Sequence, residues 1–113
     1  MSLANGPLSH VLSALDGMNK RLGKARNEFL AMKAMKDHFE ATLVKSSPGE
    51  SNAEKVVNAK ADPRWQDFHE VLNRYEAEYE YLRVQFSILE KEYQAQYLEL
   101  KLNDTAIKRG GHD

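Results

Sequence analysis

The side chains best suited to metal chemistry in this sequence are its four histidines: His10, His38, His69 and His112. If the chain folds back so that the numbers of facing residues sum to about 108, His38 lies near His69 and Glu70. The carboxylates of Asp37, Glu40 and Asp67 would also be close. Imidazole and carboxylate ligands together can hold a transition metal. Helical metal sites of the ferritin type, however, draw a Glu-x-x-His pair from each of two helices, and the sequence contains no such pair. We therefore predict no metal site.

Catalytic signatures are also absent from the sequence. It has no cysteine, no glycine-rich phosphate loop, and neither the G-x-S-x-G nor the H-E-x-x-H motif. The glutamates of the C-terminal half fall between apolar positions, on flanks that water reaches, where nothing prepares a carboxylate for acid–base work. We therefore predict a protein that is not an enzyme and that binds no cofactor.

A basic segment in the N-terminal half is the strongest argument for nucleic-acid binding. It contains Lys20, Arg21, Lys24, Arg26, Lys33 and Lys36. Proteins that bind single strands combine such residues with exposed aromatic side chains on which bases stack. Here the tyrosines occupy apolar heptad positions and the six basic residues spread around their helix, which favours solvation and ion pairing instead. Direct nucleic-acid binding through these six residues is kept as the alternative function.

The longest predicted element is the stretch 64–109, which positions His69 and the glutamates of the C-terminal half and contains neither glycine nor proline. Its apolar residues recur in steps of three and four, the spacing of a coiled-coil seam. This seam comprises Trp65, Phe68, Leu72, Tyr75, Tyr79, Leu82, Phe86, Leu89, Tyr93, Gln96 and Leu100. We predict one long helix over 63–107, with Asp62 as its N-cap and Pro63 at its first position, followed by a tail at 108–113.

The N-terminal half carries a second heptad pattern. Its members are Leu8, Val11, Leu15, Met18, Leu22, Ala25, Phe29, Met32, Lys36, Phe39 and Leu43. Gly17 and Gly23 interrupt this half, and each costs about 1 kcal/mol relative to alanine in a helix. We therefore predict a first helix over 8–45 that is firm from residue 24 and weaker or broken near 17–23. Residues 1–7 are predicted to be a flexible lead-in.

The connection at 46–62 is marked by turn residues. Pro48 cannot continue a helix, and Gly49 readily turns the chain. Ser51 and Glu54 form an S-x-x-E capping box, in which each side chain accepts from a backbone N–H that the first helical turn leaves unpaired. We predict a short helix over 52–61. Residues 1–113 would then form a single all-α domain, a long antiparallel helical hairpin of coiled-coil type with a short helix in its connection.

A second apolar series lies on the opposite side of the long helix. It comprises Ala77, Tyr81, Val84, Ile88, Ala95, Leu98 and Leu102, with Lys91 in its middle. At 100° per residue this series points roughly 160° away from the seam. Because the first helix can cover only one of the two faces, we predict a homo-oligomer, a dimer or larger. The predicted interface is Tyr81, Val84, Ile88, Ala95, Leu98 and Leu102. The alternative is a three-helix monomer in which residues 8–22 and 52–61 cover the second face.

Composition and charge bear on the compartment and on the partners of the protein. Charged residues make up 29 % of the chain and the net charge is −1, so no overall field draws it to nucleic acid or to an anionic membrane. Residues 1–49 carry a balance of +3 and residues 64–113 one of −3, which favours the two halves lying side by side. No apolar run approaches the length of a membrane span, and the N-terminus lacks the layout of a signal peptide. We predict a cytoplasmic protein without a membrane partner.

The order of motifs from residue 26 onward is similar to that of a known group. Arg26-x-x-Phe29 is followed by the Ser/Pro/Gly turn, by Ser51-x-x-Glu54, by Pro63-x-Trp65, and by a long helix rich in tyrosine and glutamate. This layout resembles small, poorly characterised helical proteins of bacteriophages and prophages, encoded among early recombination and replication genes. The resemblance implies no catalytic residue. It implies a protein that acts through a protein partner, as a recombination or replication accessory or as an inhibitor of a host factor.

Overall fold

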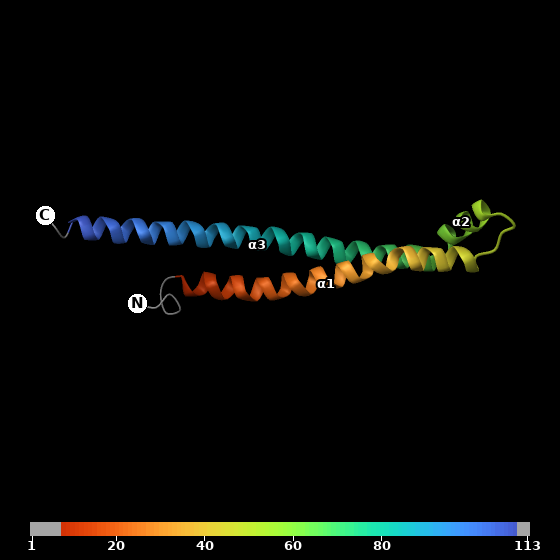
Figure 1. Cartoon of the computed structure of the whole chain (residues 1–113), viewed down its shortest axis with the longest axis horizontal. Helices are drawn as coiled ribbons and strands as arrows, with labels where there is room; N and C mark the ends of the chain where they lie inside the picture. Colours follow the sequence, from red (N-terminus) through yellow and green to blue (C-terminus); the bar gives the residue numbers. More distant parts are fainter. Residues whose placement is uncertain (1–7, 111–113) are drawn as a thin grey trace. The chain divides into compact units, whose positions relative to one another are not determined.

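The computed structural model describes residues 8–110, with side chains described for residues 8–105. This part of the chain contains three helices and no strand (Figure 1). They are α1 (Ser9–Ser46), α2 (Asn52–Ala61) and α3 (Pro63–Gly110). The predicted all-α class is therefore confirmed for the described residues. The predicted lead-in at 1–7 lies outside them.

α1 and α3 differ from the predicted helices in continuity and in length. The sequence predicts a first helix that is weaker or broken near 17–23, but α1 continues through Gly17 and Gly23 without a break. A glycine adds only about 1 kcal/mol to the cost of a helix, and the seam residues on either side of the two glycines are buried or half-buried, which offsets that cost. α3 extends to Gly110, past the predicted end at residue 107, because no residue before the Gly110-Gly111 pair stops the helix.

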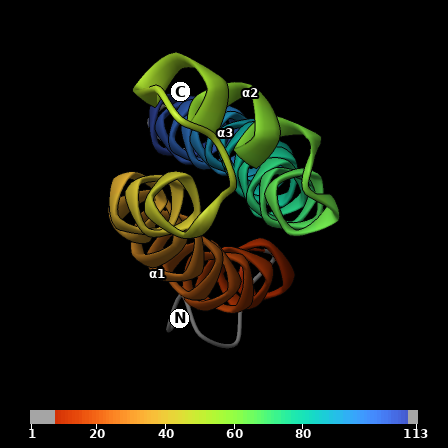
Figure 2. The same ribbon diagram turned by 90° about the vertical axis from the view of Figure 1, so that its right-hand side faces the viewer.

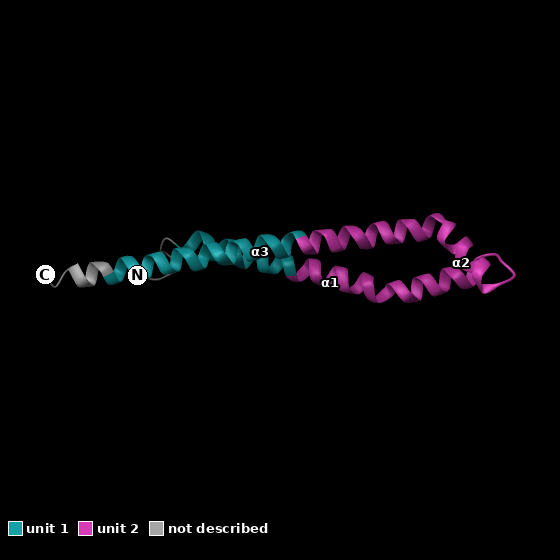
Figure 3. Cartoon of the chain, turned by 90° about the horizontal axis from the view of Figure 1, so that it is seen from above, with its two compact units in different colours: residues 1–22, 81–113 teal, residues 23–80 magenta. Residues whose placement is uncertain are grey.

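The contacts within the chain divide it into two compact units (Figure 3). Unit 1 comprises residues 1–22 and 81–113, and unit 2 comprises residues 23–80. Leu8 and Leu82 are fully buried in unit 1. The buried apolar residues of unit 2 are Ala25, Leu43, Ala59 and Leu72. The interpretation of residues 1–113 as a single domain stays a prediction.

In unit 2, aromatic side chains join α1 to α3. The rings of Phe39 and Phe68 stack with their centroids 4.4 Å apart, and those of Phe29 and Tyr79 stack at 5.8 Å. The residue number falls in α1 as it rises in α3, so the two segments run in opposite directions within this unit. Stacked aromatic pairs contribute roughly 0.5–1.5 kcal/mol each beyond the area that they bury.

Burial along α1 and α3 follows the steps of three and four. Every residue of the two predicted seams is buried or half-buried, and Leu82 retains only 1 % of its exposure. Lys36 is half-buried as well, because its aliphatic stem lies on the seam. The seam residues that the sequence identifies are therefore those that pack within each unit.

The turn between α1 and α2 requires a glycine. Gly49 has a φ of +147°, and a Cβ at this position would lie 2.9 Å from the Cβ of Glu54 and from the backbone nitrogen of Lys55. The Pro48 carbonyl accepts a 2.6 Å hydrogen bond from the Asn58 side-chain amide, which ties the turn to α2. Ser51 Oγ accepts from the Glu54 backbone N–H at 3.2 Å, as predicted for an N-cap. The reciprocal bond differs from the standard capping box, because Glu54 Oε2 accepts from the N–H of Glu50.

Asp62 separates α2 from α3 and caps the second of them. Its Oδ1 accepts from the Arg64 backbone N–H at 2.8 Å, and Oδ2 lies 2.8 Å from an Arg64 guanidinium nitrogen. These side-chain and backbone hydrogen bonds from Arg64 lower the pKa of Asp62 below its ordinary value. Pro63 occupies the first helical position, where its missing N–H costs nothing. α2 lies at this end of unit 2, beside the beginning of α3 (Figure 2).

Candidate interaction surface

One face of α3 in unit 1 is apolar and uncovered. It consists of Tyr81, Val84, Ile88, Ala95, Leu98 and Leu102, which we call the outward face because it lies opposite the seam. All six residues are exposed, Tyr81 by 61 %, Leu98 by 57 % and Ile88 by 45 %. Within unit 1, the described residues of α1 pack on the seam side of α3 and leave these six residues exposed. The alternative three-helix monomer, in which residues 8–22 and 52–61 cover this face, stays a prediction.

The outward face is interrupted once, at its midpoint. Lys91 lies between Ile88 and Ala95 and is exposed. Three apolar residues precede it and three follow it. Glu92 comes next in the chain, at the edge of the face, and is exposed as well. The centre of the apolar stripe therefore carries a positive and a negative charge side by side.

Tyr97 adds an aromatic surface between the outward face and the seam, and the sequence analysis did not single it out. It is 39 % exposed, and its ring stacks on that of Tyr93 with centroids 6.1 Å apart. The Lys101 ammonium lies 5.5 Å from the centroid of the Tyr97 ring, within the range of a cation–π contact. The sequence does contain a signal for this arrangement. Tyr93, Tyr97 and Lys101 are spaced four residues apart, and residues with this spacing lie next to each other on one side of a helix.

Two corresponding surfaces lack large apolar side chains. In unit 2 the residues of α3 at the same heptad positions as the outward face are Asp67, Glu70, Arg74 and Ala77, all exposed. In unit 1 the residues of α1 that lie opposite its own seam are His10, Ser13, Gly17 and Lys20, also exposed. Among these surfaces, only the α3 segment of unit 1 leaves a row of large apolar side chains in water.

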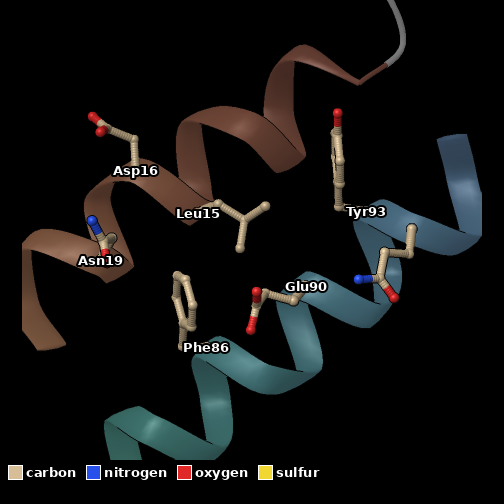
Figure 4. Close-up of a pocket in the computed structure, with 7 residues that line it drawn as sticks. Leu15, Asp16, Asn19, Phe86, Glu90 and Tyr93 are labelled. Carbon is tan, nitrogen blue, oxygen red and sulfur yellow. The ribbon is translucent and has the colours of Figure 1, made fainter.

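Unit 1 also contains a groove of about 480 Å³ between α1 and α3. In Figure 4, Leu15 of α1 and Phe86 of α3 point into the space between the helices, while Asp16 points away from it. Asp16 is bound by the Lys20 ammonium, which lies 3.2 Å from its carboxylate. The full lining is Leu15, Asp16, Asn19, Phe86, Glu90, Tyr93 and Gln94. This groove is an open part of the seam and holds no constellation of a nucleophile and a base.

The histidines do not form a metal centre with carboxylates in the described residues. His69 Nε2 lies 3.1 Å from Glu40 Oε1, but the approach is not aligned as a hydrogen bond, and this buried nitrogen has no hydrogen-bond partner in that part of the chain. His38 and His10 are exposed. Nowhere in residues 8–105 do three or more ligating side chains come together as a metal would require. His112 lies outside the described residues.

Three of the six basic residues proposed for nucleic-acid contact have acidic neighbours on α1 itself. Lys20 pairs with Asp16 at 3.2 Å, and Lys24 and Lys36 each lie 3.9 Å from a glutamate one turn away, Glu28 and Glu40 respectively. Lys33 lies 5.8 Å from the centroid of the Phe29 ring. Arg21 and Arg26 are exposed. These contacts leave less free positive charge than the sequence suggested, and nucleic-acid binding through this segment stays a prediction.

Comparison of the chain with protein-family models, with curated proteins and with solved structures found no match. The resemblance to phage and prophage proteins therefore stays a prediction. Over the described residues, none of the three helices combines the length and the apolar character that a bilayer crossing demands.

Proposed function

We propose that the protein is a non-enzymatic interaction module, a helical hairpin that self-associates through the outward face of α3. The observation that carries this proposal is the exposure of six apolar residues in one row, interrupted only by Lys91, on a helix whose other face is packed. Monomeric proteins rarely leave large apolar patches in water, and such patches mark sites of association. The antiparallel aromatic pairs of unit 2 support the hairpin.

The area that the outward face would bury supports the same proposal. Burying the exposed half of an aliphatic side chain such as Ile88 or Leu98 contributes roughly 1 kcal/mol. The free energy gained by burying the whole row can therefore offset part of the entropic cost of association.

The cellular role that we propose follows from the resemblance described above. In this proposal the protein is encoded by a phage or prophage and acts in the cytoplasm of the bacterial host. It binds another protein and serves as an accessory to recombination or replication, or inhibits a host factor. Self-association presents two or more copies of one mixed-charge surface, so the combined binding of a partner is tighter than that of one copy.

Replacing Ile88 with glutamate tests the proposed interface. Ile88→Glu places a charge in the middle of the apolar row, and we expect self-association to weaken roughly a hundredfold because the charge would be buried without a partner. The matched control is Arg74→Glu, at the same heptad position of α3 in unit 2, which we expect to leave association unchanged. Sedimentation velocity over a concentration series measures both. If both variants associate as tightly as the wild type, the outward face is not the interface. If the wild type itself stays a single chain, the protein does not self-associate and the proposal is wrong.

A further inference from the structure

We infer that the outward face binds one further copy of this chain, and that Lys91 and Glu92 form ion pairs across the centre of the resulting dimer. This inference rests on the proposed function, since it needs the outward face to be the site of association. It adds the identity of the occupant, the number of copies and the residues that limit that number.

The occupant follows from the surfaces that the chain offers. The outward-facing residues of α1 in unit 1 are His10, Ser13, Gly17 and Lys20, which present no apolar complement. The α3 segment of unit 2 offers Asp67, Glu70 and Arg74 at the corresponding positions, which are charged. Of the exposed large apolar side chains elsewhere in the described residues, Leu30 and Met35 lie on different sides of α1 and Val57 lies on α2, so they form no row. The best apolar complement for the outward face is therefore the same face on another copy. Contacts between identical surfaces close after two copies, because a two-fold axis relates them.

The two charges at the centre of the face complement each other in such a pair. The apolar stripe runs from Tyr81 to Leu102, and its midpoint falls between Lys91 and Glu92. Lys91 and Glu92 lie on opposite sides of the centre line of the face. In two parallel copies related by a two-fold axis, Lys91 of one copy therefore shares an edge of the contact with Glu92 of the other. An antiparallel pair would place Lys91 beside Lys91, so the inferred dimer is parallel. Within one helix, neighbouring residues do not face each other, so Lys91 and Glu92 of the same copy do not satisfy one another.

Lys91 also explains why association stops at two. In a contact between two α3 helices, the lysine stem lies along the interface while its ammonium reaches the edge, where water and Glu92 of the second copy solvate it. In a bundle of three or more α3 helices, the same ammonium would be enclosed by apolar side chains, at a high cost in desolvation. A single lysine at a core position of a coiled coil is known to fix the number of strands in this way, and it lowers stability as it does so.

The test uses two charge reversals, each made in the full chain. Lys91→Glu leaves acids at positions 91 and 92, and Glu92→Lys leaves bases at both. Since like charges would meet across the centre, we expect each variant alone to associate at least about tenfold more weakly than the wild type. Mixed in equal amounts, the two variants should associate with near wild-type affinity as mixed pairs. Labelling one variant with nitrogen-15 allows native mass spectrometry to distinguish mixed pairs from self-associated ones, and circular dichroism checks that each variant keeps its helix content.

The outcomes separate this inference from the proposed function. A dimeric wild type whose reversed variants recover only when mixed supports the inference. If the wild type associates but each variant alone associates equally well, or if the mixture pairs at random, Lys91 and Glu92 do not meet and the inference is overturned while the interface stands. A wild type with three or more copies overturns the inference in the same way. A wild type that remains a single chain at high micromolar concentration overturns the proposed function as well.

Discussion

α3 presents different surfaces opposite its seam in the two units. In unit 2 the positions carry Asp67, Glu70 and Arg74, and in unit 1 they carry the apolar outward face. On the seam side the two segments are alike, since both bury aromatic and aliphatic residues at steps of three and four. The seam therefore accounts for how each unit packs α1 against α3. The side of α3 opposite the seam is where the units differ. In unit 2 its charged residues are readily solvated by water, whereas in unit 1 its apolar residues would be stabilised by association.

The two units also differ in how their helix ends are held. Unit 2 contains the whole connection, with the Gly49 turn, the Ser51 cap and the hydrogen bonds between Asp62 and Arg64. In unit 1, by contrast, the paired segments of α1 and α3 meet without a connecting turn within the unit. Within the described residues of unit 1, seam contacts therefore hold the two segments together without the help of a local turn.

The largest expected effect comes from placing a charge on the seam of unit 1. Leu82 is 1 % exposed, so Leu82→Glu buries an unpaired carboxylate and should lower the free energy of unfolding by about 4 kcal/mol or more. We expect loss of helix by circular dichroism, whereas Ile88→Glu should lose association and keep much of its helix. Leu82→Met, which preserves volume and apolar character, serves as the control. Similar helix loss in Leu82→Glu and Ile88→Glu would contradict the assignment of one packed and one open face.

A smaller effect of opposite sign is expected at Gly17. It lies within the continuous α1, and a Cβ placed there would have no heavy atom within 4 Å outside the local backbone. Gly17→Ala should therefore raise the free energy of unfolding by about 0.5–1 kcal/mol, because alanine loses less conformational entropy in a helix. Thermal unfolding at fixed protein concentration measures the change. Destabilisation would mean that unit 1 needs the glycine for a close contact or for a bend in α1. The matched substitution Gly23→Ala in unit 2 should have a similar effect, since that site is equally open.

Much of this architecture could be predicted from the sequence because it depends on local rules. The step pattern that places Leu72 and Leu82 on the seam follows from helical geometry, and both residues are buried. The N-caps at Ser51 and Asp62 follow from side-chain chemistry, and both side chains accept the expected backbone N–H. The exposure of Ile88 and Leu98 follows from the same wheel, since only one side of α3 can face α1.

Other features depend on packing and could not be predicted. The break expected at Gly17 and Gly23 does not occur, because helix propensity is a weak term that seam packing outweighs. The partner of Glu54 is the Glu50 N–H and not that of Ser51, a choice set by the path of the turn. Glu40 and His69 lie close together as expected, but the alignment that leaves His69 Nε2 without a hydrogen bond depends on the rotamers of two helices. The acidic neighbours of Lys20, Lys24 and Lys36, by contrast, lie four residues away on the same helix, a spacing that the sequence already contains.

The most direct test of the outward face measures whether it is covered. The chain has no cysteine, so a single introduced thiol reports its own accessibility. Leu98→Cys places a thiol on the outward face, and Arg74→Cys places one at a solvated position of unit 2. The rate of alkylation of each is measured from nanomolar to high micromolar protein concentration. We predict that the thiol at position 98 becomes protected as concentration rises while the thiol at position 74 reacts at a constant rate. Equal and constant rates at both positions would contradict the account.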